Sequence, residues 1–124
     1  MSPLEVLLVA VGGGLGAALR FVLDGVVKSR VSGFPLGTMV INVSGSLVLG
    51  LLTGLGQAGT LALVPVAVLG TGMMGGYTTF STASVETVRL VQAGKTGSAV
   101  LNSLGMLVVS VGAAALGLWL GRNT

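Results

Sequence analysis

Histidine and cysteine are both absent from the sequence, and charged side chains make up only 7% of its 124 residues. Without histidine and cysteine the chain lacks the usual ligands for zinc, haem and iron–sulfur clusters, and it has neither a thiol nucleophile nor a disulfide. No nucleophile–base pair can be assembled from the remaining residues, so an enzyme is not predicted. Basic runs and aromatic-rich basic faces are missing too, which argues against nucleic acid as a partner.

Hydrophobic residues, in contrast, make up 52% of the sequence, and the mean hydropathy is +1.02. A helix needs about 20 apolar residues to cross a membrane. Four stretches meet this requirement, at residues 4–23, 36–57, 62–88 and 98–120, and the connections between them are too short to fold separately. The sequence therefore predicts an all-α integral membrane protein, with residues 1–124 forming a single four-span domain.

The first span combines small residues with a pair of opposite charges near its end. Gly12 and Gly16 form a G-x-x-x-G pattern, which lets membrane helices approach closely. Arg20 and Asp24 stand one helical turn apart, where the two charges can neutralise each other. We expect the glycines to pack against another span and the two charged residues to have a structural role.

The second span carries polar residues at a helical spacing. Thr38, Asn42 and Ser46 recur every four residues, so they share one face of the helix. Hydroxyl groups can bond back to their own helix, whereas the amide of Asn42 needs partners that a single helix does not supply. Asn42 is therefore either a contact between helices or part of a polar pathway, and the pattern alone leaves both open.

The third span contains the most unusual stretch of the chain, a run from Gly70 to Glu86 that is rich in glycine and hydroxyl residues. In lipid, such a run is expected either in a broken helix that lines a polar cavity or in a helix that packs tightly against its neighbours. The span is longer than a straight crossing requires, which favours a break at the Gly-rich stretch. Glu86 lies near the membrane surface, as an anchor or as part of a vestibule.

The fourth span adds Asn102 and Ser103, with Ser110 two turns later on the same side. Across all four spans the polar groups are amides and hydroxyls, and no carboxylate lies in the middle of a span. Cation and proton transporters usually place an acidic residue there. Hydroxyl and amide donors can replace the water shell of a small anion, and the edge of a phenyl ring can assist. An anion pathway is the better electrostatic match.

Three stretches of this sequence resemble the Fluc/CrcB family of fluoride channels: Gly-Gly-Leu-Gly-Ala-Ala-Leu-Arg-Phe at 13–21, Gly-Thr-Met-Val-Ile-Asn-Val-Ser-Gly at 37–45, and Gly-Gly-Tyr-Thr-Thr-Phe-Ser-Thr-Ala-Ser-Val-Glu at 75–86. The resemblance implies a passive channel that exports fluoride across a prokaryotic plasma or inner membrane. It also implies an antiparallel dimer with two pores, each built from both chains, and a structural sodium ion at the dimer interface.

The resemblance also implies roles for individual residues in the conduction of fluoride. Asn42 is similar to the pore asparagine of the family, Phe80 to the first ring of a phenylalanine pair, and Glu86 to a glutamate at the pore end. The expected pathway comprises nine side chains, namely Thr38, Asn42, Ser46, Phe80, Ser81, Thr82, Glu86, Ser103 and Ser110.

Four further residues are expected to support this pathway. The backbone carbonyls of Gly75 and Thr78 correspond to the sodium ligands of the family, and carbonyl oxygens suit a hard cation. Arg20 matches the arginine that closes the first span of the family. Asn102 is expected to be structural, or to belong with Ser103 and Ser110 to the family's polar track.

The sequence departs from the family pattern at Ala83, where a second phenylalanine is usual. The basic residues are also unevenly distributed. Lys28 and Arg30 fall in the predicted first connection and Arg89 and Lys95 in the third, while only Arg122 lies at the other side. The positive-inside rule then predicts both termini outside. A chain with such a bias inserts in one orientation, so a heterodimer with an inverted paralogue is favoured over a homodimer.

Two other functions are compatible with a compact four-span chain. A small multidrug-type transporter has the same size, but it normally depends on an acidic residue within its first span, whereas Glu5 lies at the very start here. A non-conducting accessory subunit held together by its glycine faces is the second alternative.

Overall fold

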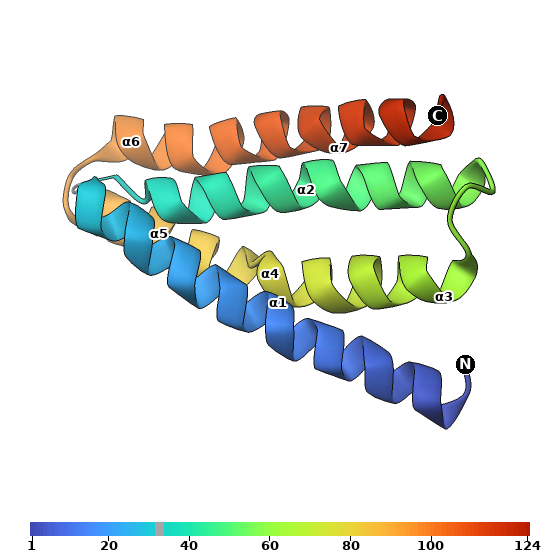
Figure 1. The fold of residues 1–124 in the computed structure, drawn as a ribbon. Coiled ribbons are helices and arrows are strands. Elements are labelled where there is room, and N and C mark those ends of the chain that lie inside the picture. The colour runs from blue at the N-terminus through green and yellow to red at the C-terminus, as the bar shows by residue number, and fades with distance from the viewer. Residues whose placement is uncertain (32–33) are drawn as a thin grey trace.

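The structure is a computed structural model that describes residues 1–31 and 34–124, and it consists of helices joined by short turns (Figure 1). Four helical segments are long and apolar enough to cross a membrane: Pro3–Arg30, Leu36–Gln57, Leu63–Gln92 and Thr96–Arg122. The first is helix α1 and the second is helix α2. These segments confirm the predicted all-α architecture with four spans.

The third and fourth spans are each built from several helical pieces. The third contains α3 (Leu63–Val66), a π-helical segment (Ala67–Met74), α4 (Gly75–Tyr77) and α5 (Phe80–Gln92). The fourth contains α6 (Thr96–Val100), a π-helical segment (Leu101–Gly105) and α7 (Met106–Arg122). Between α4 and α5 the backbone is extended, with Thr78 at φ −82° and ψ 155° and Thr79 at φ −148° and ψ 119°.

The predicted break in the third span is present within the Gly70–Glu86 run, but it falls on threonines and not on the glycines. Gly70, Gly72 and Gly75 all lie in helical backbone, and the extended residues Thr78 and Thr79 come after them. Threonine is β-branched and favours extended backbone, which explains why the helix ends there.

The glycines of the third span serve close packing against α1. A methyl group added to Gly16 would collide with the backbone carbonyl of Met73, and one added to Gly76 would collide with the carbonyl of Gly13. Gly12 and Gly16 are the buried residues of α1, as the G-x-x-x-G pattern predicts. Both expected uses of the Gly70–Glu86 run therefore occur, tight packing at its glycines and a break at Thr78 and Thr79.

A Gly16→Ala variant is expected to be less stable than the wild type by about 1–3 kcal/mol, because the new methyl group forces the two backbones apart. Gly14→Ala is the matched control on the same helix, since a methyl group there meets no atom within 4 Å. Thermal unfolding in detergent would measure both variants. Equal melting temperatures for Gly16→Ala and Gly14→Ala would contradict the close contact.

The connections between the spans are shorter in the structure than the sequence predicts. Lys28 and Arg30 lie in the last turn of α1, and Arg89 lies within α5, so none of them belongs to a turn. Helix α1 starts at a capping box in which Ser2 and Glu5 bond to each other's backbone amides, and it continues until Val31. Basic side chains are favourable at a helix C-terminus, which explains why the helices extend through them.

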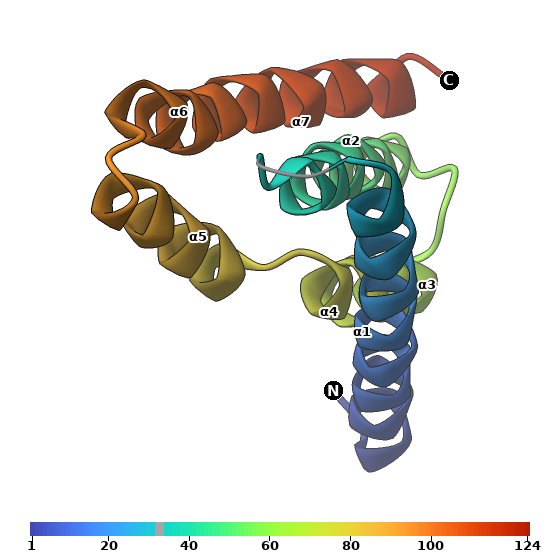
Figure 2. The ribbon, with the colours of Figure 1, turned by 90° about the vertical axis from the view of Figure 1, so that its left-hand side faces the viewer.

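The four spans pack as two close pairs with α5 set apart. Helix α2 packs along α7, and α1 packs along the first half of the third span. Beyond the break, α5 leans toward the beginning of the fourth span (Figure 2). Both termini lie at one end of the molecule, and the C-terminal ends of α1 and α5 lie at the other (Figure 1). The break therefore gives the two halves of the third span different neighbours.

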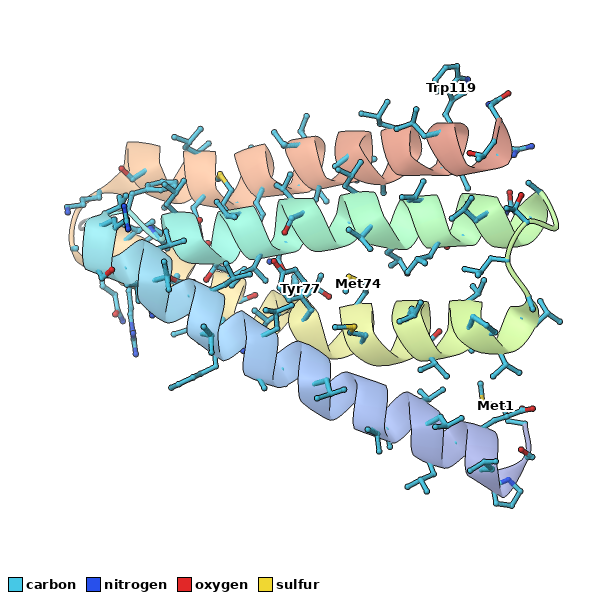
Figure 3. All side chains as sticks on the ribbon, viewed as in Figure 1. Met1, Met74, Tyr77 and Trp119 are labelled. Atoms are coloured by element: carbon cyan, nitrogen blue, oxygen red, sulfur yellow. The ribbon has the colours of Figure 1, made fainter. Side chains whose placement is uncertain are left out.

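The small buried core joins α2 to the third span. It consists of Ile41 and Leu52 from α2 together with Met74 and Tyr77. Met74 and Tyr77 point from the third span toward α2, while Trp119 stands on the outer side of α7 (Figure 3). The Tyr77 hydroxyl lies 2.9 Å from the Ser44 hydroxyl, so the aromatic ring fixes α4 on α2 just before the break.

Candidate functional site

A groove of about 640 Å³ lies between α2, α5 and the fourth span. It collects most of the polar residues that the sequence singled out in these three segments. Its predicted members are Asn42, Ser46, Thr78, Phe80, Asn102, Ser103 and Ser110, and its further lining residues are Leu49, Thr79, Ala83, Ser84, Thr87, Leu104, Met106 and Leu107. None of these side chains carries a charge, so the groove, as far as its described lining shows, offers neutral donors and apolar surface.

The side chain of Asn42 is hydrogen-bonded to the backbone at the break in the third span. Its side-chain Nδ2 donates to the Thr79 carbonyl at 2.9 Å, and its Oδ1 accepts from the Thr79 amide at 2.8 Å. The extended backbone at Thr79 thus finds the two partners that a continuous helix would have supplied. Asn42 Nδ2 also lies 3.2 Å from the Met106 sulfur. The residue is therefore a contact between spans, and it also lines the groove.

Helix α5 begins at the groove with Phe80. The Thr79 hydroxyl accepts from the Thr82 amide at 3.3 Å, which caps the helix and fixes its first turn. The Phe80 side chain is 87% exposed, so it makes few contacts within the chain. Ala83 lines the groove one turn further along α5.

The fourth span contributes unpaired polar atoms to the groove. Asn102 is fully buried, and its Nδ2 donates to the Thr87 hydroxyl at 2.8 Å. Among the described residues, the Asn102 Oδ1 and the Ser110 hydroxyl are buried without a hydrogen-bond partner. Ser103 is different, because its hydroxyl donates to the Ala99 carbonyl of its own helix at 2.9 Å. Asn102 thus joins the fourth span to α5 through Thr87, and both Asn102 and Ser110 line the groove.

Ser81, Thr82 and Glu86 do not lie in this groove. They line a second pocket, of about 280 Å³, together with Lys28, Val85 and Arg89. The Thr38 side chain is 2% exposed, and its hydroxyl donates to the Glu86 carboxylate. The nine expected pathway residues are thus divided between the groove and the second pocket. Thr38 lines neither of them, but it is hydrogen-bonded to Glu86 of the second pocket.

The predicted neutralisation of Arg20 by Asp24 is wrong. Arg20 Nε donates to the Gly76 carbonyl at 3.2 Å, and Asp24 forms an ion pair with Lys28 at 2.9 Å. Within a helix, an acid is better placed one turn before a base than one turn after it, so Lys28 is the more favourable partner for Asp24. Through this hydrogen bond Arg20 joins α1 to α4.

The break also changes the surroundings of the Gly75 and Thr78 carbonyls. In an unbroken helix these two carbonyls would accept from the amides of Thr79 and Thr82. Here the Thr79 amide donates to Asn42, and the Thr82 amide donates to the Thr79 hydroxyl. Gly75 also has open space where a side chain would stand. Both carbonyl oxygens thereby lose their usual helical donors.

Three residues with contacts at or near the break and the groove escaped the sequence interpretation. Thr79 forms the break, Thr87 pairs with Asn102, and Ser44 meets Tyr77. Thr87 lies seven residues after Phe80, so helical spacing places both on the same face and could have identified it. For Ser44 no comparable signal exists, because its partner comes from another span.

The sequence also matches known proteins over almost its whole length. Residues 7–118 match the family model described as CrcB-like protein, Camphor Resistance. The chain is 57% identical to fluoride-specific ion channel FluC 1 of Leifsonia xyli subsp. xyli, covering 98% of this chain and 89% of the relative. It is 44% identical to FluC 1 of Streptomyces avermitilis, with 94% of each chain covered, and 48% identical to FluC 2 of Cutibacterium acnes, with 97% of this chain and 99% of the relative covered.

The names of these relatives describe ion channels and not enzymes. These matches, the four spans and the uncharged groove all agree with the resemblance to fluoride channels that the sequence motifs indicate. This multi-pass membrane chain belongs to the Fluc/CrcB family of fluoride channels.

Proposed function

We propose that the chain is a fluoride-selective passive channel that exports fluoride from the cytoplasm across a prokaryotic cell membrane. The observation that carries this proposal is the groove, in which the amides of Asn42 and Asn102 and the Ser110 hydroxyl share one lining with the exposed Phe80 ring. These groups can solvate a small anion, and no described lining residue would bind a cation by charge. The relatives are named as fluoride-specific channels.

The conducting unit is proposed to be an antiparallel dimer. In lipid, the accessible polar side chains of the groove, such as Asn42, Ser46 and Ser103, would find no partners among the acyl chains. A second subunit over the groove would cover these side chains and the exposed Phe80 ring. Two such grooves, one for each subunit, would then give two pores.

The charges favour an inverted paralogue as the second subunit. Lys28, Arg30, Arg89 and Lys95 all belong to the end of the molecule that lies opposite the termini, whereas Arg122 lies near the C-terminus. The basic end is expected in the cytoplasm, with both termini outside. Reporter fusions to the two termini would test this orientation, and equal signals from both sides of the membrane would contradict it.

A structural sodium ion at the dimer interface is also proposed. The Gly75 and Thr78 carbonyls, whose usual helical donors are redirected by the break, are the residues that would hold it. Neutral carbonyl oxygens are suitable ligands for a hard monovalent cation. A bound sodium ion would supply positive charge that ties together the broken third spans of two subunits.

Fluoride efflux from liposomes tests the proposed function directly. The chain is reconstituted alone and again with an adjacent paralogue, and electrogenic efflux without a proton gradient is expected in at least one preparation. Transport of organic cations that depends on a gradient would instead support the small multidrug-type transporter. If neither preparation conducts, the non-conducting accessory subunit becomes the better explanation.

An Ala83→Phe variant is expected to conduct fluoride faster than the wild type when the chain is reconstituted as a homodimer. Ala83 lines the groove beside Phe80, so a new ring would add a second aromatic edge toward the anion. Val88→Phe is a control on the same helix, because Val88 is 54% exposed and does not line the groove. Equal gains from both variants would show that position 83 has no special role.

A further inference from the structure

The second pocket is lined by three charged residues, two hydroxyl residues and one valine, over about 280 Å³. Ser81, Val85 and Arg89 are spaced four residues apart on α5 and so form one face of that helix, and Lys28 reaches the pocket from the end of α1. The pocket is therefore a charged mouth at the basic end of the molecule, distinct from the uncharged groove.

Two acidic groups lie near this pocket. Asp24 Oδ2 forms an ion pair with Lys28 at 2.9 Å, while its Oδ1 is buried without a hydrogen-bond partner. The Glu86 carboxylate accepts a hydrogen bond from the neutral Thr38 hydroxyl, on the side of α2. Within residues 1–31 and 34–124, Asp24 and Lys28 form the only ion pair within 4 Å. Arg89 is therefore an exposed cation that a mobile anion can reach without displacing a carboxylate.

We propose that Arg89 makes this pocket the site where fluoride is collected from the cytoplasm before it reaches the pore, with Lys28 as a weaker contributor because Asp24 compensates it. This inference rests on the proposed function. A cation in a recess with low-dielectric walls raises the local concentration of anions and speeds their capture. The hydroxyls of Ser81 and Thr82 lie in the same lining and would donate to the collected ion.

The test compares efflux rates at two ionic strengths, using a large impermeant salt. At about 0.01 M salt, exposed charges act over about 30 Å, whereas at about 1 M they act over about 3 Å. We expect Arg89→Gln to lower efflux by about threefold or more at low salt and to match the wild type at high salt. Arg89→Lys keeps the charge and is expected to conduct like the wild type at both.

Two further variants separate local charge from other effects. Lys95→Gln removes the same charge at the same end of the molecule but outside the pocket, so it is expected to leave low-salt efflux nearly unchanged. Asp24→Asn preserves shape while releasing Lys28, and it is expected to raise low-salt efflux by about twofold. Arg89→Gln and Asp24→Asn thus have opposite expected effects.

The outcomes are distinguishable from failure of the proposed function. If the wild type does not conduct fluoride, alone or with a paralogue, the proposed function fails and the inference fails with it. If the wild type conducts and Arg89→Gln equals it at low salt, only the inference is overturned. A deficit of Arg89→Gln that persists at high salt, or one shared by Lys95→Gln, would also overturn it, because neither reflects capture by local charge.

Discussion

Fluoride efflux is expected to be abolished in an Asn42→Ala variant, and the protein is expected to lose stability as well. The amide of Asn42 supplies both hydrogen-bond partners of the Thr79 backbone, and alanine supplies neither. Leaving a buried backbone group unpaired costs about 1–3 kcal/mol, and two such groups lie at the start of α5. Phe80 and the whole of α5 would then lose their fixed position beside the groove.

Efflux assays and thermal unfolding of Asn42→Ala would measure these two effects. Ser44→Ala is the matched control, since it removes a polar group of α2 that contacts Tyr77 and not the break. The control is expected to conduct fluoride at a rate close to that of the wild type. If Asn42→Ala kept most of its flux, the amide would be neither a support of the break nor part of the pathway.

The second large effect is expected from Phe80→Ala, which should abolish flux while leaving the fold intact. The ring is 87% exposed, so its removal leaves no cavity inside the chain. Its position beside Asn42 in the groove means that the change removes the aromatic edge from the proposed anion path. Loss of transport without loss of stability distinguishes this variant from Asn42→Ala.

Phe21→Ala provides a closely matched control for this experiment. Phe21 is 81% exposed on α1, and it does not line the groove. Both variants remove one exposed phenylalanine from a membrane-spanning helix, so general effects of lost apolar surface should be the same. Near-normal efflux from Phe80→Ala, or an equal loss from Phe21→Ala, would count against the assigned pathway.

The spans and their packing faces could be predicted from local sequence patterns. Hydropathy located α2 at its observed limits, and the spacing of Gly12 and Gly16 identified the face of α1 that packs against the third span. Both signals depend only on neighbours along one helix. The ends of α1 were harder to predict, because charged side chains such as Lys28 remain compatible with a helix that reaches the membrane surface.

Contacts between spans account for what sequence patterns could not locate. Asp24 was expected to pair with Arg20, but Arg20 donates to a carbonyl of the third span, and Asp24 pairs with Lys28. The break was placed among the glycines because glycine tolerates unusual backbone, yet its position depends on an amide 37 residues away. A partner so distant in the chain leaves no periodic signal in the third span.

The amide of Asn42 has the same donor and acceptor as a peptide group, and it pairs with Thr79 as a neighbouring extended strand would. The interruption of the third span therefore depends partly on a residue of the second span, Asn42. This means that the break is not a portable motif. Residues 63–92, transferred into another protein or studied as an isolated peptide in detergent, are expected to lack the fixed interruption unless a carboxamide is supplied at the level of Thr79.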